Sequence, residues 1–279
     1  MFSASASQPP VSFSYKNIEE RDFMISSINK DLESSSIWIA THVDAVHREL
    51  DSVISSYFSQ PEYKLLKMSL RQYRALMYET QVALNKKNFN TRILSSIKYA
   101  LMEYLQTEDF LVQSNLYLRA SRPFTPYETE NIGWHRESFY GPNLARSINI
   151  WTPIKGVSEK NTLRYIPKSQ LIPDENIVTR NIGESSTERF SVGHKLGFNY
   201  DPKIIEKGVD FSSAQPLYFA VKRSAIFSGN LIHGAAVNRC KNIRFSVDFQ
   251  IIKKEDYSTK NKTFHFSSGL PYFEEFEFS

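Results

Sequence analysis

Apolar side chains recur at two different periods along the chain, and the change falls near residue 110. Between residues 15 and 109 they recur about every 3.6 positions, the spacing of a helix that buries one face. This helical region is predicted to contain helices over residues 17–32, 37–58, 61–85 and 91–105. Residues 1–14 are rich in Ser, Ala and Pro, and we expect them to be loose.

From residue 110 to 252, apolar and polar positions alternate instead, which is typical of short strands. The predicted strands cover residues 111–120, 146–153, 162–167, 216–220, 224–227 and 243–251. In the last of these, Arg244, Ser246, Asp248 and Gln250 share one face and their apolar neighbours share the other. Many short strands separated by turns favour a double-stranded β-helix, also called a jelly roll.

Together these patterns predict an α+β protein with one structural domain overall. Its jelly-roll catalytic core is expected over residues 110–252, with the helical region of residues 15–109 packed on it. Residues 172–212 lack periodicity and mix Pro, Gly, Ser and charge, so we expect a lid there. Residues 253–279 form an aromatic tail, expected either to pack back on the body or to bind a partner.

Composition narrows the protein class. The chain has 34 basic and 30 acidic residues, a balance that does not favour nucleic acid as a partner. Its single cysteine, Cys240, rules out a disulfide within the chain, which favours a reducing compartment. We find no signal peptide and no apolar run of membrane-spanning length. The sequence therefore predicts a cytoplasmic protein without a nucleic-acid or membrane partner, and it leaves the oligomeric state open.

A histidine followed two positions later by a carboxylate is a possible metal-binding pair. Three such pairs occur where chance expects roughly 0.6, namely His42 with Asp44, His47 with Glu49, and His135 with Glu137. Residues i and i+2 point the same way on a strand but diverge on a helix. The first two pairs lie in a predicted helix and are expected to form a solvated face. The third lies in the strand-rich half and is the better candidate.

A third ligand is suggested by His233, which ends an apolar run and precedes Gly234 and two alanines. Two histidines and one carboxylate form the facial triad that holds non-haem Fe(II) and leaves coordination positions open. Arg244 follows on an alternating strand with Ser246 on the same face. An inward arginine there is costly unless it is paired, and the carboxylate of 2-oxoglutarate would pair with it. The alternatives are a core histidine satisfied by the backbone and a structural arginine–carboxylate pair.

Two sets of motifs carry a family resemblance. Asn230-Leu231-Ile232-His233-Gly234, continuing through Asn238 to Arg244-Phe245-Ser246, resembles the C-terminal signature of the phytanoyl-CoA dioxygenase superfamily of Fe(II)/2-oxoglutarate oxygenases. The runs Ser147–Pro153 and Asn161–Gln170 resemble that family's central strands. The resemblance covers about residues 110–252, and within the family it is strongest to the branch found in bacterial sugar and antibiotic biosynthesis.

The resemblance implies that His135, Glu137 and His233 hold Fe(II), and that Arg244 and Ser246 hold the distal carboxylate of 2-oxoglutarate, with O2 as the second co-substrate. It also places Trp151, and less firmly Tyr117, beside the co-substrate, although barrel packing is the alternative for both. Two positions depart from the family pattern. Glu137 stands where an aspartate is usual, and Gln170 ends a run that usually reads Pro-Gly-Ser-His.

The implied activity is a dioxygenase that hydroxylates a small polar metabolite, releasing succinate and CO2; desaturation, cyclisation or epimerisation would use the same site. The candidate residues that line the substrate site are Arg136, Tyr140, Arg146, Arg180, Arg189, His194 and Lys195. They suggest a polar, anionic substrate. Two other functions stay open, namely a cupin-type metal-dependent isomerase or lyase, and a catalytically silent scaffold that binds through its helices and tail.

Overall fold

The computed structural model describes residues 37–125, 133–181, 203–261 and 271–278. The helices of the N-terminal half are α3 (Asp44–Tyr57), α4 (Glu62–Lys67), α5 (Leu70–Lys86), α6 (Phe89–Ser96) and α7 (Lys98–Leu105), and a short α8 (Pro142–Ala145) follows. Ser69 begins α5 with a capping box, because it exchanges side-chain hydrogen bonds with Gln72. Among the described residues, no helix combines the length and apolar character needed to span a bilayer.

The main sheet is antiparallel and runs in the order β1-β9-β4-β11-β2-β12, with β3 also paired to β11. Its strands are β1 (Trp38–Thr41), β2 (Phe110–Gln113), β3 (Tyr117–Ser121), β4 (Ile148–Lys155), β9 (Arg223–Ser228), β11 (Arg244–Lys253) and β12 (Phe273–Glu275). A smaller antiparallel sheet runs β10-β5-β8, from β5 (Leu163–Tyr165), β8 (Gln215–Pro216) and β10 (His233–Ala235). A third pair joins β6 (Val178–Asn181) to β7 (Lys203–Lys207).

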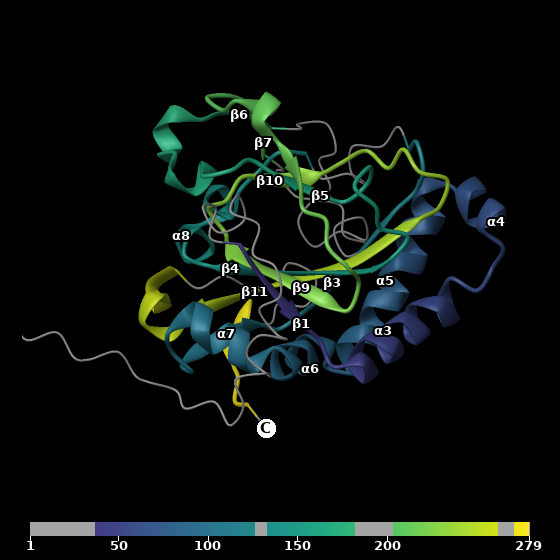
Figure 1. Cartoon of the computed structure of the whole chain (residues 1–279), viewed down its shortest axis with the longest axis horizontal. Coiled ribbons are helices and arrows are strands. Elements are labelled where there is room, and N and C mark those ends of the chain that lie inside the picture. The colour runs from purple at the N-terminus through teal and green to yellow at the C-terminus, as the bar shows by residue number, and fades with distance from the viewer. Residues whose placement is uncertain (1–36, 126–132, 182–202, 262–270, 279) are drawn as a thin grey trace, which may run out of the picture.

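The helices pack on one face of the main sheet (Figure 1). Their buried side chains, such as Leu50 and Ile93, share one core with Ile150, Val247 and Phe249 of β4 and β11. Those strand residues alternate with the polar positions of the same strands, so the polar positions face the opposite side. The helical region therefore covers one face of the sheet and leaves the other for a functional site.

The smaller sheet lies over that opposite face. Trp151, Ala225 and Phe227 from the main sheet form one apolar cluster with Leu163 and Tyr165 from the smaller sheet. In Figure 1, β5 and β10 lie above the main sheet while α6 and α7 lie below it. The observed architecture is thus a mixed α/β arrangement of antiparallel sheets, with polar side chains of β11 enclosed between apolar layers.

The predicted elements differ from the observed ones in the N-terminal half. The helix expected from residue 37 to 58 begins only at Asp44, because Trp38–Thr41 forms β1 against β9, with Trp38 opposite Ile226. The helix expected over 61–85 is two helices, interrupted where Met68 adopts extended backbone. The one expected over 91–105 is interrupted at Ile97. The helix expected over 17–32 lies outside the described residues.

The irregular regions also contain more structure than their sequence predicts. Residues 172–181 and 203–212 hold the β6–β7 pair, although 182–202 lie outside the described residues. The segment predicted as one strand over 111–120 is two strands, both paired with β11. In the tail, β12 pairs with β2 and Phe273 is buried, while the Phe276 ring stacks on Phe110.

Candidate metal centre

Two segments from distant parts of the chain bring His135 and His233 together. Each histidine donates its backbone N–H to the other's carbonyl oxygen, and both bonds are 3.0 Å long. Arg136 has extended backbone, so Glu137, two residues beyond His135, points to the same side. The Glu137 N–H donates to the Gly229 carbonyl at 2.8 Å, which fixes the start of the short 3₁₀ turn Glu137–Tyr140.

The three side chains converge on one point. Glu137 Oε1 lies 3.9 Å from His135 Nε2 and 3.8 Å from His233 Nε2, and all three ligand atoms lie within 4.8 Å of one another. Two bonds of about 2.1 Å can together span roughly 4.2 Å, so one ion can bridge the carboxylate to either ring. All three side chains are largely buried. These are the only described residues that gather three metal-ligating side chains in this way.

Backbone carbonyls fix the orientation of both imidazoles. His135 Nδ1 donates to the Gly133 carbonyl and His233 Nδ1 to the Leu231 carbonyl, each at 2.8 Å. A carbonyl oxygen can only accept, so the proton of each neutral ring lies on Nδ1 and the Nε2 lone pair faces Glu137. Burial lowers the pKa of each histidine to about 4, so both rings are neutral and ready to ligate at pH 7.

The ionised form of the Glu137 carboxylate is disfavoured when no cation is bound. Burial raises the pKa of Glu137, and the opposing influences of His233 and a hydrogen bond from Gln250 only partly compensate. Nearby, Arg119 donates two hydrogen bonds, of 2.7 and 2.8 Å, to Asp248, so this pair neutralises itself. A buried carboxylate between two neutral imidazoles is a donor set that suits a divalent cation, and the residues present therefore fit Fe(II).

A second polar site lies at the beginning of β11. Arg244 and Ser246 are fully buried, yet Arg244 Nε and Ser246 Oγ have no hydrogen-bond partner within the described chain. The Arg244 guanidinium makes one bond, from Nη1 to the Asn161 carbonyl at 3.0 Å. Burial, followed by repulsion from Arg119, lowers the pKa of Arg244 to about 10. Unused donors on a buried cation fit a carboxylate ligand.

The strand register places the two predicted aromatic residues on the same side. Asp248 on β11 lies opposite Tyr117 on β3 and Trp151 on β4, and residues directly opposite in a sheet share a face. Trp151 packs edge-on against Phe219, 5.6 Å between ring centroids, in the apolar layer between the sheets. Burial raises the pKa of Tyr117 to about 12, so it keeps its proton.

The three predicted substrate-lining cations that the structure describes each have a partner. Arg136 is buried and pairs with Asp174, so it anchors the segment before β6 and points away from the triad. Arg180 pairs with Glu206, and Arg146 donates to the Asp256 carbonyl. Tyr140 does lie close to the metal centre, with its ring 6.3 Å from that of His135. The remaining candidates, Arg189, His194 and Lys195, lie outside the described residues.

The two other His-x-acid pairs are not metal sites, and one expectation about them is wrong. His42 and His47 are buried rather than solvated. His42 precedes α3, and its Nε2 lies 2.5 Å from the Ser224 hydroxyl. His47 and Glu49 both lie on α3, where residues two apart diverge, and Glu49 pairs instead with Lys87 and Arg92. Asp44 pairs with Arg48 and Lys222.

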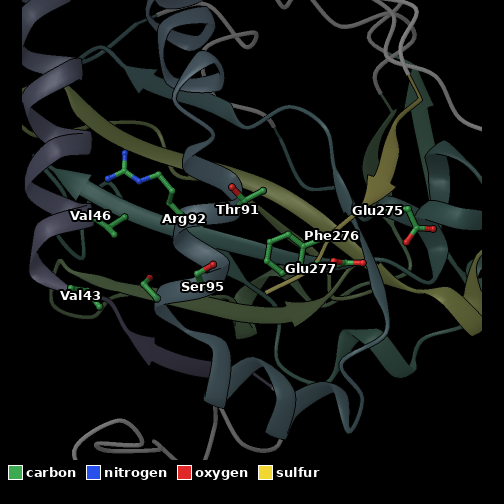
Figure 2. A pocket seen from close by; sticks show the side chains of 9 residues that line it. Val43, Val46, Thr91, Arg92, Ser95, Glu275, Phe276 and Glu277 are labelled. Carbon is green, nitrogen blue, oxygen red and sulfur yellow. The ribbon is translucent and has the colours of Figure 1, made fainter. Parts of the chain in front are cut away.

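A groove of about 610 Å³ has lining residues that do not include His135, Glu137 or His233 (Figure 2). It is bounded by α3, α6 and the segment after β12, and Val46, Ser95 and Phe276 are among its lining residues. Two of its three charged residues have partners, because Arg92 contacts Glu49 and Glu275 contacts Lys254. The groove gathers no metal ligands, so the chemistry resides between the sheets.

Sequence patterns missed two residues near the triad. Gln250, predicted only to face the polar side of its strand, hydrogen-bonds Glu137. Tyr272, from the tail, donates its hydroxyl proton to Gln250 Oε1 at 3.0 Å. Tyr272 carries no sequence signal for this role, because its distance along the chain from Glu137 hides the contact. Gly234 allows a close approach of the two ligand segments, since an added Cβ would lie 3.1 Å from the Gly133 carbonyl.

Antiparallel sheets that enclose a two-histidine, one-carboxylate centre define a class of non-haem metal proteins. The family model for phytanoyl-CoA dioxygenase (PhyH) matches residues 40–246, well over half of the chain. The chain belongs to this family and is an Fe(II)/2-oxoglutarate-dependent oxygenase-type enzyme, with Fe(II), 2-oxoglutarate and O2 as its cofactor and co-substrates. No curated protein matches the sequence.

The chain is similar to several solved structures at low sequence identity. EvdO2 from Micromonospora carbonacea var. aurantiaca is 13% identical, with a TM-score of 0.53 over 85% of this chain and 97% of that one. Its complex with 2-oxoglutarate is 14% identical, with a TM-score of 0.51 over the same shares. The epimerase SnoN in complex with Fe3+, α-ketoglutarate and nogalamycin RO is 11% identical, with a TM-score of 0.48 over 91% and 96%.

Proposed function

We propose that His135, Glu137 and His233 hold Fe(II), and that Arg244 and Ser246 grip the distal carboxylate of 2-oxoglutarate. The enzyme would hydroxylate a small polar metabolite in a biosynthetic pathway and release succinate and CO2. The two sheets around this site would form a double-stranded β-helix. The observation that carries the proposal is the pair of buried, unused donors on Arg244 and Ser246, on the same sheet side as Gln250, which hydrogen-bonds Glu137.

Bound Fe(II) with 2-oxoglutarate and O2 supplies the oxidising power for attack on an unactivated C–H bond. The chain's own residues do the positioning. Gly133 and Leu231 hold the imidazoles so that both Nε2 atoms face the carboxylate. The Arg244 guanidinium and the Ser246 hydroxyl would orient the co-substrate from its far end. Tyr117 and Trp151 would form walls that keep water from the reacting end.

The carboxylate at position 137 bears on the type of reaction. Glu137 fills the place that an external halide would need, so hydroxylation is favoured over halogenation. Arg136 and Arg180 pair with carboxylates, so these two cations are not expected to hold an anionic substrate. Desaturation, ring closure and epimerisation would need the same residues, and the identity of the substrate decides among them.

Anaerobic titration with Fe(II) and then 2-oxoglutarate tests the proposal. The wild-type protein should develop the weak visible charge-transfer band of the chelate. His233→Ala should bind no iron at this site, and Arg244→Gln should require far more 2-oxoglutarate because a charged two-point contact is lost. His47→Gln is the matched control, because His47 is a buried histidine in the helical region.

A band that persists in His233→Ala would refute the triad. Bound metal without a band on adding 2-oxoglutarate would instead favour a cupin-type isomerase or lyase. No metal at all would favour a silent scaffold protein. The control should behave like the wild-type protein in each measurement.

A further inference from the structure

Gln250 joins the proposed metal ligand Glu137 to the tail of the chain. The Tyr272 hydroxyl donates to Gln250 Oε1 at 3.0 Å. The amide oxygen of Gln250 is thereby engaged, which leaves its Nε2 to donate to the Glu137 carboxylate, the group with which it forms a side-chain hydrogen bond. The three groups therefore form one relay, Tyr272 to Gln250 to Glu137, with every donor pointing toward the carboxylate.

Gln250 and Tyr272, the two donors of the relay, are held firmly in place. Gln250 is more than nine-tenths buried, and its backbone N–H donates to Gln113 Oε1 at 2.8 Å. Ser114 receives the tail, because its N–H donates to the Tyr272 carbonyl at 3.0 Å and its hydroxyl to the Pro271 carbonyl at 2.8 Å. Burial raises the pKa of Tyr272 well above its ordinary value, so the hydroxyl remains a donor throughout the working pH range.

Glu137 needs such support more than either histidine does. Each imidazole is fixed by its own Nδ1–H bond to a carbonyl two residues away. A glutamate has no equivalent local anchor, and its side chain has one more rotatable bond than an aspartate. Without an external donor, its carboxylate could turn away from the two Nε2 atoms. Hydrogen-bonded partners of this kind orient metal ligands and raise metal affinity.

We propose that Tyr272 is a positioning residue of the metal centre, which acts through Gln250 to hold the Glu137 carboxylate toward His135 and His233. The C-terminal segment around β12 is thus part of the active site. This inference rests on the proposed function, because it takes Glu137 to be a metal ligand. The tail would then support the metal centre, whereas its sequence left open that it binds a partner.

Co(II) serves as the probe, because its visible bands report ligand geometry and it binds without turnover. Tyr272→Phe removes one hydroxyl and should raise the dissociation constant for Co(II) about tenfold or more and alter the bands. Tyr257→Phe is the matched control, since Tyr257 also packs on Phe273, at 6.1 Å between ring centroids, but lies outside the relay. Thermal unfolding of the metal-free proteins should be alike for the two variants.

A double-mutant cycle that combines Tyr272→Phe with Glu137→Asp tests whether Tyr272 acts through Glu137. The shorter aspartate cannot reach Gln250, so in that background Tyr272→Phe should change Co(II) affinity by no more than about twofold. The same loss in both backgrounds would mean that Tyr272 acts on the fold and not through Glu137, and would overturn the relay. Unchanged affinity in Tyr272→Phe alone would overturn it as well.

Gln250→Met keeps the length of the side chain but removes the amide, so it repeats the test if Tyr272→Phe does not fold. It should lose Co(II) affinity to at least the same extent, and wild-type affinity would overturn the proposal. Failure of the wild-type protein to bind Co(II) would refute the proposed triad itself. If the wild-type protein binds Co(II) and both variants bind it equally well, only the relay is refuted.

Discussion

Replacing Arg244 by Met should affect the free protein and the liganded protein in opposite directions. In the free protein the guanidinium is fully buried and, among the described residues, has one acceptor, the Asn161 carbonyl. Burial lowers its pKa from 12.5 to about 10, which corresponds to a penalty of about 3 kcal/mol for keeping it charged at pH 7. Methionine removes that penalty, but it costs about 1 to 3 kcal/mol by leaving the Asn161 carbonyl unpaired.

The expected unfolding free energy of metal-free Arg244→Met is therefore unchanged or higher by up to about 2 kcal/mol. Affinity for 2-oxoglutarate should fall by about 2 to 5 kcal/mol, because a buried charged contact is lost. That is roughly 30- to several-thousand-fold in the dissociation constant. Urea unfolding measures the first quantity, and calorimetric titration with 2-oxoglutarate in the presence of Mn(II) measures the second.

Arg119→Met is the matched control on the neighbouring strand. Arg119 already has a carboxylate partner, Asp248, so its loss leaves a partly buried charge unpaired and should destabilise the free protein by at least about 2 kcal/mol. The reasoning fails if Arg244→Met behaves in the same way and keeps its affinity for 2-oxoglutarate within tenfold. Arg244 would then be a structural residue.

Two further predictions concern histidine burial and the joint between the ligand segments. His42→Asn should flatten the pH dependence of the unfolding free energy. Burial lowers the pKa of His42 from 6.5 to about 3, so the wild-type protein loses stability as the pH falls below 6.5. Between pH 8 and pH 5 the wild-type protein should lose about 2 kcal/mol more than the variant. Identical urea-unfolding curves for the two proteins across pH would contradict this. Gly234→Ala should weaken Co(II) binding by up to about a hundredfold, since its Cβ would press on the Gly133 carbonyl at 3.1 Å and shift the ligands. Unchanged Co(II) affinity would show that the backbone yields without moving the histidines.

The faces of the strands were predictable from sequence because the two-residue period is local. Alternation alone placed Arg244 and Ser246 together and Phe245 and Val247 opposite, and the structure confirms both sides. The same period separated His135 and Glu137 from the two similar pairs in the helical region. The extended backbone at Arg136 is the local feature on which that choice depended.

The first observed strand was missed because its partner is far away in sequence. The apolar spacing of Trp38–Thr41 continues without a break into α3, so a helical period fits both. What makes this segment a strand is pairing with β9, in which Thr41 lies opposite Arg223. A four-residue segment has too little local preference to reveal such a partner.

The partners of charged and polar side chains could not be predicted either, because they also lie far away in the sequence. Arg136 was predicted to line the substrate site, yet it pairs with Asp174, which lies 38 positions along the chain. Gln250 was correctly placed on the polar face, but only folding brings Tyr272 to it. Local patterns show which way a side chain points and do not show what it meets there.

The strand β11 explains how the protein tolerates a costly site. One face carries Phe245, Val247 and Phe249 into the core shared with the helices, and the other carries the unused donors of Arg244 and Ser246. Each buried donor without a partner costs about 1 to 3 kcal/mol, while each buried phenylalanine or valine contributes about 1.5 to 3. The helical region thus stabilises the strand that the site destabilises. Binding of 2-oxoglutarate should then raise the unfolding free energy most in the protein that keeps both Arg244 and Ser246. The size of this increase therefore measures how much these two residues contribute to binding 2-oxoglutarate.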